Sequence, residues 1–185
     1  MKIITGKYKG RVIGLPRGIR PTQGVVRKAL FDILGDIEGM SFLELFSGSG
    51  AVGFEAVSRG VNDLTLVEYN RDCLLAIRKS IEALKLKACA LYPGEAEAAI
   101  KAICKNKRKF DIIFMDPPYH KGMSKKFLQM IGGYDILAPN GFVVVQHFNR
   151  EELPKESGNL VLIKQSRYGD TVLSFYHKHN KLGDV

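Results

Sequence analysis

Residues 42–54 read FLELFSGSGAVGF, and this stretch decides the fold. A short apolar run ends at Phe46, and three glycines then follow at the spacing G-x-G-x-x-G. Glycines at positions 48, 50 and 53 allow a tight turn and let a ligand approach the backbone closely. The stretch therefore predicts a strand, a ligand-binding turn and a helix. A turn that only joins a strand to a helix would give the same pattern.

Strand and helix patterns alternate on both sides of this turn. The predicted strands are 40–46, 62–68, 88–92, 110–116 and 141–147, and the predicted helices are 49–59, 70–86, 95–106 and 123–136. Two further strand-like runs, 159–166 and 171–177, are joined by a turn and predict a terminal antiparallel hairpin. These patterns indicate an α/β fold with a mostly parallel seven-stranded sheet and helices on both faces.

The first 21 residues are predicted to form a small extension. Residues 2–4 and 7–13 alternate around Thr5-Gly6, which is typical of a β-hairpin. Thr22 is a candidate N-cap for a helix that buries Val26 and Leu30. We therefore expect an extension at 1–21, a main domain at 22–180 and a tail at 181–185.

The positive charge is concentrated near the N-terminus. The 185-residue chain has 28 Lys and Arg against 19 Asp and Glu, and residues 1–31 contain eight basic residues and no acid. One-sided charge favours a nucleic-acid partner over a surface that is merely solvated. We expect residues 1–28 to grip RNA phosphates beside the catalytic crevice, and the predicted RNA-binding residues are Lys7, Lys9, Arg11, Arg20, Thr22 and Arg27.

The composition also excludes several classes of protein. No apolar stretch approaches the roughly 20 residues of a membrane helix, and the start, MKIITGKYKG, lacks a signal-peptide core. The three cysteines are widely spaced and form no CxxC pair, which favours a reduced protein without a metal site. We expect a cytoplasmic protein that makes no membrane contact. The sequence does not fix the oligomeric state, although a monomer is favoured.

Two carboxylates near the glycine turn indicate which cofactor it binds. Glu68 closes the next predicted strand, twenty residues after Gly48, where a carboxylate can accept both hydroxyls of a ribose. Glu44 precedes the turn, where an acid suits a cationic ligand better than a pyrophosphate. S-adenosylmethionine carries an ammonium, a sulfonium and a ribose but no phosphate. The two acids therefore favour it over NAD.

A second candidate site, DPPY at 116–119, follows the fourth predicted strand. In an open α/β sheet, the end of this strand is expected to face the same crevice as the end of the first. The Asp116 carboxylate and the Pro117 carbonyl can accept the two N–H groups of an exocyclic base amine, and the prolines stiffen the loop. Tyr119 offers a face for an unstacked base. The alternative is a proline-rich turn with Tyr119 in the core.

Nearly the whole chain resembles a known bacterial family. The similar stretches are KIITGKYKGR (2–11), RPTQGVVRKALFDIL (20–34), LELFSGSGAVGFEAVSRG (43–60), VEYN (67–70), DPPY (116–119) and RYGDT (167–171). The family consists of S-adenosylmethionine-dependent methyltransferases that modify the N2 amine of guanine 966 in 16S ribosomal RNA. The resemblance implies a Rossmann-like class I methyltransferase fold and S-adenosylhomocysteine as a product. It also implies ribosomal RNA as the substrate, either naked or within an assembling small subunit.

The resemblance also implies roles for matching residues. The target base would be held by Asp116, Pro117, Pro118 and Tyr119, and Arg20 and Thr22 would lie over the site. The residues that would bind the cofactor are Glu44, Phe46, Ser47, Gly48, Gly50, Glu68, Tyr69, Glu95 and Ala96. The family usually has Asp at positions 44 and 95, so the longer side chains here shift the contact geometry.

Other functions share parts of this pattern. DNA adenine-N6 and protein glutamine methyltransferases also use an acid or amide followed by Pro-Pro-aromatic. However, 185 residues leave little room for a DNA target-recognition region, and the protein-modifying relatives usually have Asn at position 116. A non-catalytic RNA-binding module is disfavoured by the intact glycine turn, Glu68 and DPPY. The sequence does not show which nucleotide is modified.

Overall fold

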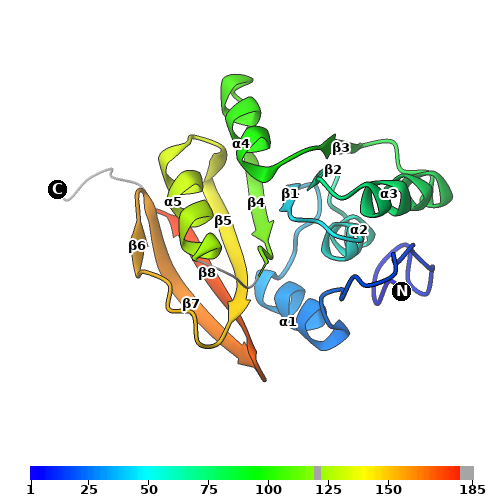
Figure 1. Cartoon of the computed structure of the whole chain (residues 1–185), viewed down its shortest axis with the longest axis horizontal. Helices are drawn as coiled ribbons and strands as arrows, with labels where there is room; N and C mark the ends of the chain where they lie inside the picture. The colour runs from blue at the N-terminus through cyan, green and yellow to red at the C-terminus, as the bar shows by residue number, and fades with distance from the viewer. Residues whose placement is uncertain (119–121, 180–185) are drawn as a thin grey trace. The chain divides into compact units, whose positions relative to one another are not determined.

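A computed structural model describes residues 1–118 and 122–179, in which five helices and eight strands occur (Figure 1). The chain divides into two compact units, Met1–Ala99 and Ile100–Val185. The predicted boundaries of an N-terminal extension, a main domain and a tail stay a prediction. Within the described ranges, no helix is long and apolar enough to cross a membrane.

The first unit contains three parallel strands in the order β3-β2-β1. Their bounds are β1 (Ser41–Leu45), β2 (Asp63–Glu68) and β3 (Cys89–Pro93), and the helices are α1 (Gly24–Leu34), α2 (Ala51–Ser58) and α3 (Arg71–Leu84). Helix α2 packs against β1 and β2, and α3 packs against β3. Leu43 of β1 and Leu66 of β2 are fully buried, which explains the continuous apolar runs of these strands.

Gly53 allows α2 to lie close to the sheet. A Cβ atom at this position would lie 2.6 Å from Leu66 Cδ2 and 2.8 Å from Glu44 Oε2. The third glycine of the motif is therefore required by packing, whereas the first two are required by the turn itself.

The predicted helix starts are correct at α3 and wrong at α1. Asn70 caps α3, because its Oδ1 atom accepts hydrogen bonds from the backbone N–H groups of Asp72 (2.9 Å) and Cys73 (3.2 Å). The N-cap position of α1 is Gln23, one residue after the predicted Thr22, and no side chain caps this helix.

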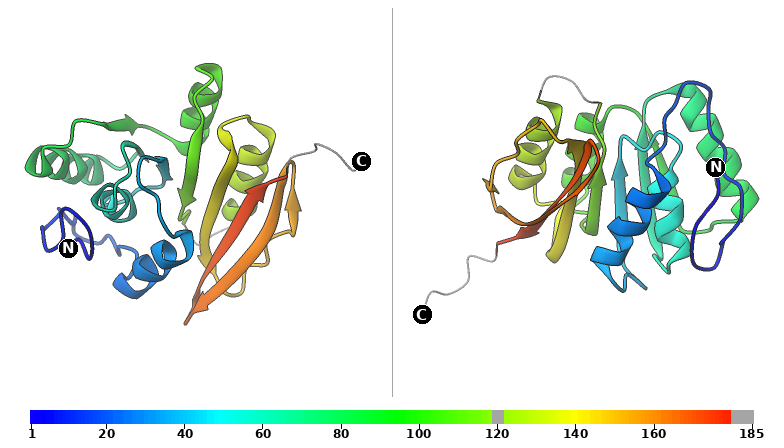
Figure 2. Two further views of the ribbon diagram at one scale, coloured as in Figure 1. Left: turned by 180° about the vertical axis from the view of Figure 1, so that it is seen from behind. Right: turned by 90° about the horizontal axis from the view of Figure 1, so that it is seen from below.

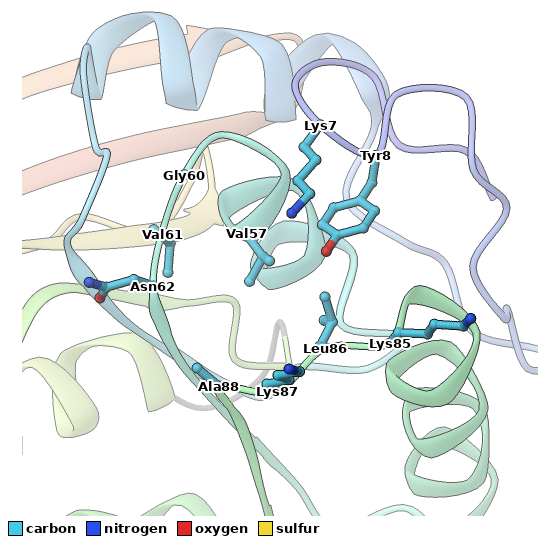
Figure 3. Close-up of a pocket in the computed structure, with 10 residues that line it drawn as sticks. All are labelled: Lys7, Tyr8, Val57, Gly60, Val61, Asn62, Lys85, Leu86, Lys87 and Ala88. Atoms are coloured by element: carbon cyan, nitrogen blue, oxygen red, sulfur yellow. The ribbon is translucent and has the colours of Figure 1, made fainter.

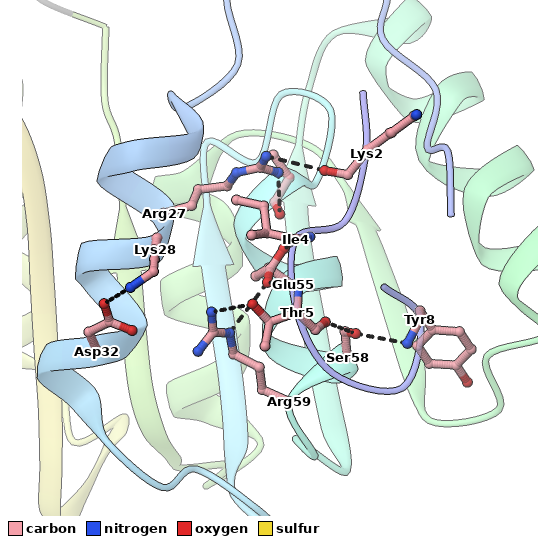
Figure 4. Close-up of polar contacts among 11 residues, drawn as sticks. Lys2, Ile4, Thr5, Tyr8, Arg27, Lys28, Asp32, Glu55, Ser58 and Arg59 are labelled. Carbon is pink, nitrogen blue, oxygen red and sulfur yellow. Dashed lines mark hydrogen bonds and ion pairs between the residues drawn. The ribbon is translucent and has the colours of Figure 1, made fainter. Parts of the chain in front are cut away.

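The two ends of the N-terminal segment pair with each other. Lys2 and Val12 form an isolated antiparallel bridge, Ile3 N donates to the Arg11 carbonyl (3.0 Å), and Ile13 N donates to the Met1 carbonyl (2.8 Å). Several N–H groups nearer the tip of the segment donate to α2 instead (Figure 4). The buried Glu55 carboxylate accepts from Ile4 N (2.8 Å) and Thr5 N (2.9 Å). The predicted hairpin is thus present only at its paired ends and forms no regular strands, because acceptors on α2 bind the N–H groups nearer its tip.

The second unit has five strands in the order β4-β5-β8-β7-β6. Their bounds are β4 (Phe110–Met115), β5 (Leu137–Phe148), β6 (Glu156–Ser157), β7 (Leu160–Tyr168) and β8 (Thr171–Lys178). Helix α4 (Ala96–Lys105) leads into this unit, and α5 (Met123–Gly133) lies against β5 and β6 (Figure 2). Strands β4 and β5 are parallel, and β7 and β8 form the predicted antiparallel hairpin.

Two features of the second unit differ from the prediction. Strand β5 begins at Leu137 rather than 141, because a register shift between Phe110 and Ile112 lets the turn-like residues 137–140 continue the strand. Strand β6 was not predicted, because two residues show no periodicity. Parallel strands joined by helices and followed by an antiparallel hairpin confirm the predicted α/β class.

Candidate functional site

The carboxyl ends of β1, β2 and β3 bring the predicted cofactor residues of the first unit to one edge. The three strands are parallel and in register, so the loops that follow Leu45, Glu68 and Pro93 are neighbours. Gly48 N donates to Glu68 Oε2 over 2.7 Å, and Gly94 N donates to the Glu68 carbonyl over 2.8 Å. Glu68 therefore connects all three loops.

The Glu68 carboxylate is more fully used than the sequence indicates. Its second oxygen, Oε1, accepts from Tyr69 N (3.0 Å) and Asn70 N (2.8 Å), and the residue is only 6% exposed. A carboxylate offers about four acceptor positions, and three of these are occupied by backbone N–H groups. It can take one further hydroxyl donor while it keeps these contacts.

The glycine turn has a left-handed backbone at three positions: Phe46 (φ 58°), Gly48 (φ 54°) and Gly50 (φ 72°). Phe46 is an uncommon residue for this conformation, and such strain clusters at ligand sites. The Ser47 hydroxyl accepts from Val67 N (3.0 Å) and donates to the Glu44 carbonyl (2.8 Å). Ser47, a predicted cofactor residue, thus holds the turn against β2.

Glu44 lies under the start of α2. The residue is 3% exposed, and its Oε2 atom accepts from Gly53 N over 2.8 Å, in the first turn of the helix. A carboxylate at this place is stabilised by the positive end of the α2 helix dipole. Its predicted contact with the methionine ammonium stays a prediction.

Four residues at this edge indicate whether a nucleoside fits the site. Ser49 lies in the turn, is 2% exposed, and has a buried Oγ atom without a hydrogen-bond partner in the described part of the chain. A buried hydroxyl of this kind is costly unless a polar group satisfies it. Tyr69 is 58% exposed beside Glu68 and offers a free ring face for a purine. Glu95 is also exposed, whereas Ala96 is buried. The set fits a nucleoside cofactor, and Ser49 was missed because a serine between glycines gives no distinct signal.

The chain before α1 passes over the glycine turn. A Cβ atom on Gly48 would lie 3.7 Å from Ile19 Cγ2, and the next residue, Arg20, is exposed. Arg20 directly follows this contact, and the predicted positions of Arg20 and Thr22 over the site stay a prediction.

Arg27 is a structural residue rather than an RNA contact. It is 3% exposed, and its guanidinium donates to the carbonyls of Ala51 (3.5 Å) and Lys2 (3.3 Å) (Figure 4). Burial lowers the pKa of Arg27, and the nearby Glu55 and Glu44 carboxylates oppose this shift. The guanidinium therefore joins α1, the start of α2 and the N-terminal segment, and it is not available to phosphates.

Two contacts place Lys7 and Arg11 of the N-terminal segment away from the turn. Lys7 N donates to the carbonyl of Ser58 (2.7 Å), the last residue of α2, and Arg11 Nη2 donates to the carbonyl of Ala83 (3.1 Å) near the end of α3. Both helices end at the edge where β2 and β3 begin. Lys7 and Arg11 are therefore held at the edge of the first unit opposite the glycine turn, and the predicted contact of Lys7, Lys9 and Arg11 with RNA stays a prediction.

In the second unit, Asp116 follows β4 directly and is half-buried. Its Oδ2 atom accepts from Gln146 Nε2 over 2.7 Å, because Met115 and Val145 are paired in register and the two polar residues come next. Burial raises the pKa of Asp116 to about 7. Pro117 is buried and Pro118 exposed, and Tyr119 lies outside the described residues.

Gln146 was missed by the sequence analysis. It is 4% exposed, and its Oε1 atom is buried without a hydrogen-bond partner in the described residues. Its only signal is a polar residue in an apolar strand. The adjacent His147 is 2% exposed and contacts Ser174 Oγ over 2.7 Å, and burial lowers the pKa of its imidazole. His147 is thus part of the interior of the sheet.

Comparisons with known proteins agree over nearly the full chain. A sequence model of the family described as "Conserved hypothetical protein 95" matches residues 1–177. The Bacillus subtilis protein "Putative rRNA methyltransferase YlbH" is 35% identical over 96% of this chain and 99% of its own length. The Escherichia coli K12 "Ribosomal RNA small subunit methyltransferase D" is 28% identical over 96% of this chain and 90% of its own length. The solved structure titled "Putative methyltransferase yhhF from Escherichia coli" has a TM-score of 0.86 and is 27% identical. The match covers 98% of this chain and 99% of that structure's chain.

The fold and these neighbours define an α/β protein of the Rossmann-like methyltransferase class. Within that class, the chain belongs to the family described as Conserved hypothetical protein 95. The resemblance to the bacterial small-subunit ribosomal RNA methyltransferases is thereby confirmed at the level of the family.

Proposed function

We propose that the protein transfers a methyl group from S-adenosylmethionine to the exocyclic N2 amine of a guanine in small-subunit ribosomal RNA. The observation that carries the proposal is the Asp116 carboxylate, placed directly after β4 and oriented by a hydrogen bond from the buried Gln146. The names of the relatives support ribosomal RNA as the substrate.

The first unit is proposed to bind the cofactor. Glu68 would accept a ribose hydroxyl at its remaining acceptor position, and the Tyr69 ring would lie against the adenine. The Ser49 hydroxyl would gain a partner in the turn. When bound, S-adenosylmethionine supplies a methyl group on a sulfonium that leaves as a neutral thioether.

The second unit is proposed to hold the target amine. A base amine is a poor nucleophile, because its lone pair is delocalised into the ring. Asp116 and the Pro117 carbonyl would accept its two N–H groups, which orients the nitrogen and favours a localised lone pair. After attack the nitrogen carries a positive charge and releases a proton to solvent, so no strong base is required. The stacking role of Tyr119 stays a prediction.

Two features support RNA over the other substrates of this chemistry. The formal net charge of +9 suits a polyanion. Residue 116 is Asp, whereas the resemblance gives Asn for the protein-modifying enzymes.

The direct test is to incubate the purified protein with labelled S-adenosylmethionine and small-subunit RNA from a strain that lacks it. Digestion to nucleosides should yield labelled N2-methylguanosine. Parallel reactions with free RNA and with assembling small subunits would identify the form of the substrate. Label in N6-methyladenosine, in DNA or in protein would overturn the proposal.

A further inference from the structure

A cationic pocket lies at the opposite edge of the first unit from the glycine turn. It has a volume of about 410 Å³ and is lined by the ends of three segments, residues 7–8, 60–62 and 85–88, together with Val57 (Figure 3). Residues 60–62 precede β2 and residues 85–88 precede β3, whereas Glu68 ends β2. Strand β2 has six residues, so the pocket and the turn are about 20 Å apart.

The lining of this pocket combines positive charge with an aromatic ring. Lys7, Lys85 and Lys87 carry three ammonium groups around the pocket, with that of Lys85 directed away from Tyr8 (Figure 3), and Val57 and Leu86 form part of an apolar floor. The Tyr8 ring points from the N-terminal segment toward Leu86, beside the Lys7 side chain, whose Nζ atom lies 5.6 Å from the ring centroid (Figure 3). None of the described residues that line it is acidic.

The positive charge of the three lysines exceeds the negative partial charge of the helix ends around the pocket. Helices α2 and α3 both end at this pocket, and each end is equivalent to about half a negative charge. Two ends thus offset about one of the three ammonium groups. None of the three forms an ion pair within residues 1–118 and 122–179. An excess of positive charge is therefore available to an external anion.

The segments that carry these side chains are fixed in place. Tyr8 N donates to Ser58 Oγ over 2.9 Å, and Lys7 N donates to the Ser58 carbonyl over 2.7 Å. Gly6 permits this close approach, because a Cβ atom there would lie 1.7 Å from the same carbonyl oxygen. On the other side, Lys85 caps α3 in a left-handed conformation (φ 53°). A site held by its backbone in this way loses little freedom when it binds a ligand.

We propose that this pocket binds one nucleotide of the RNA substrate, with a phosphate near the lysines and the base against Tyr8. The inference rests on the proposed function and adds a second RNA contact about 20 Å from the cofactor turn. A ring beside cationic side chains is the usual arrangement for single-stranded nucleic acid, since stacking accepts any base and the charge follows the backbone. An anionic lipid surface would also suit lysines beside a tyrosine, so the test below includes lipid vesicles as a competing outcome.

The test compares two double variants that remove the same charge from the same region. Lys85→Gln with Lys87→Gln changes the pocket, and Arg78→Gln with Lys79→Gln changes the exposed face of α3. The Kd for a small-subunit RNA fragment is measured at several salt concentrations. We expect the pocket variant to raise Kd roughly two- to tenfold and to flatten the slope of log affinity against log salt by about 0.7 for each phosphate that is no longer neutralised. The matched control should change Kd less than twofold.

Tyr8 provides the second arm. Tyr8→Ala should weaken RNA binding, whereas Tyr8→Phe should retain it, because stacking requires only the ring. Equal losses in both double variants, or unchanged RNA affinity in the pocket variant, would overturn the proposal. Binding to vesicles of anionic lipid that depends on Lys85 and Lys87, with no change for RNA, would also overturn it.

The readouts separate this proposal from the proposed function. If the wild-type protein binds RNA through Lys85 and Lys87 but methylates none, the pocket stands and the methyltransferase assignment fails. If the pocket variant methylates RNA with an unchanged KM, the assignment stands and the pocket fails. The affinity for S-adenosylhomocysteine should be equal in all these variants, which confirms that the first unit remains folded.

Discussion

The Glu68 carboxylate accepts backbone N–H groups from Gly48, Tyr69 and Asn70, so it shapes the glycine turn, and its proposed contact with a ribose hydroxyl would be a fourth hydrogen bond. Glu68→Ala should weaken the binding of S-adenosylhomocysteine by about 1.5–3 kcal/mol, the value of hydrogen bonds to a charged group. It should also lower the melting temperature, because three N–H groups lose their acceptor. Titration calorimetry with S-adenosylhomocysteine and with NAD measures the affinities, and scanning calorimetry measures the melting temperature. Tight NAD binding, or an unchanged affinity in the variant, would contradict the assignment.

Asp116 makes the stability of the protein depend on pH. Its pKa is raised by burial from 3.8 to about 7, so the folded state binds more protons than the unfolded state between these values. This contribution is largest below about pH 4 and is lost as the pH rises to 7, because the fold disfavours the ionised form. Asp116→Asn should remove it. Urea denaturation across this pH range should give a wild-type free energy of unfolding that falls relative to the variant, and parallel curves would contradict the account.

Gln146 is expected to hold Asp116 in its ionised, accepting form. Gln146→Leu removes the donor at 2.7 Å and should raise the pKa of Asp116 further. The rise of methyl transfer with pH should then move to higher pH, with little change in the affinity for the nucleoside cofactor. Gln165→Leu is the matched control, since Gln165 donates to Ser174 rather than to Asp116. The account fails if both variants have the same pH profile.

The sequence identified the residues whose chemistry is typical of a motif and missed those that depend on tertiary contacts. Glu68 was predicted because it ends the strand that follows the glycine turn. Asp116 was predicted because it follows a strand directly and precedes two prolines. Gln146 and Ser49 were missed, because their significance depends on strand register and on burial. Arg27 was misassigned, since its charge alone does not show that it is enclosed by α1 and α2.

At the scale of elements, the packing of α2 on β2 depends on the absence of a side chain at Gly53. Gly53→Ala places a methyl group 2.6 Å from Leu66 and 2.8 Å from Glu44, so we expect a loss of about 1–3 kcal/mol of stability. Gly133→Ala is the control, because nothing lies within 4 Å of its Cβ position. Chemical denaturation of both variants decides the point. A Gly53 variant as stable as the control would show that α2 does not lie this close to the sheet.

The helices and strands were predictable where a hydrophobic pattern extends over a long stretch of sequence. The parallel strands and their helices occur close to the expected ranges, because a continuous apolar run and a helical repeat each have one structural solution. The N-terminal hairpin was over-predicted for a different reason. The N–H groups of Ile4 and Thr5 bind the carboxylate of Glu55, 51 and 50 residues away, and no local pattern reveals such a partner.

For the whole molecule, the folded chain separates positive charges that lie close in sequence. Lys7 lines the pocket at the start of β2, Arg20 lies in the segment over the glycine turn, and Arg27 is buried. Net charge favours a polyanionic partner, but it does not show where such a partner would bind. The position of each cation depends on which helix the N-terminal segment contacts, and this is a property of the folded protein alone.

The central claim is that Asp116 acts on the target amine and not on the cofactor. The most direct test is single-turnover methyl transfer to small-subunit RNA by Asp116→Ala, with the affinity for S-adenosylhomocysteine measured on the same preparation. The account predicts that methyl transfer is abolished, while the nucleoside affinity stays within about twofold of wild type because no acceptor of the first unit is changed. Retained methyl transfer, or a loss of activity matched by an equal loss of cofactor affinity, would contradict it.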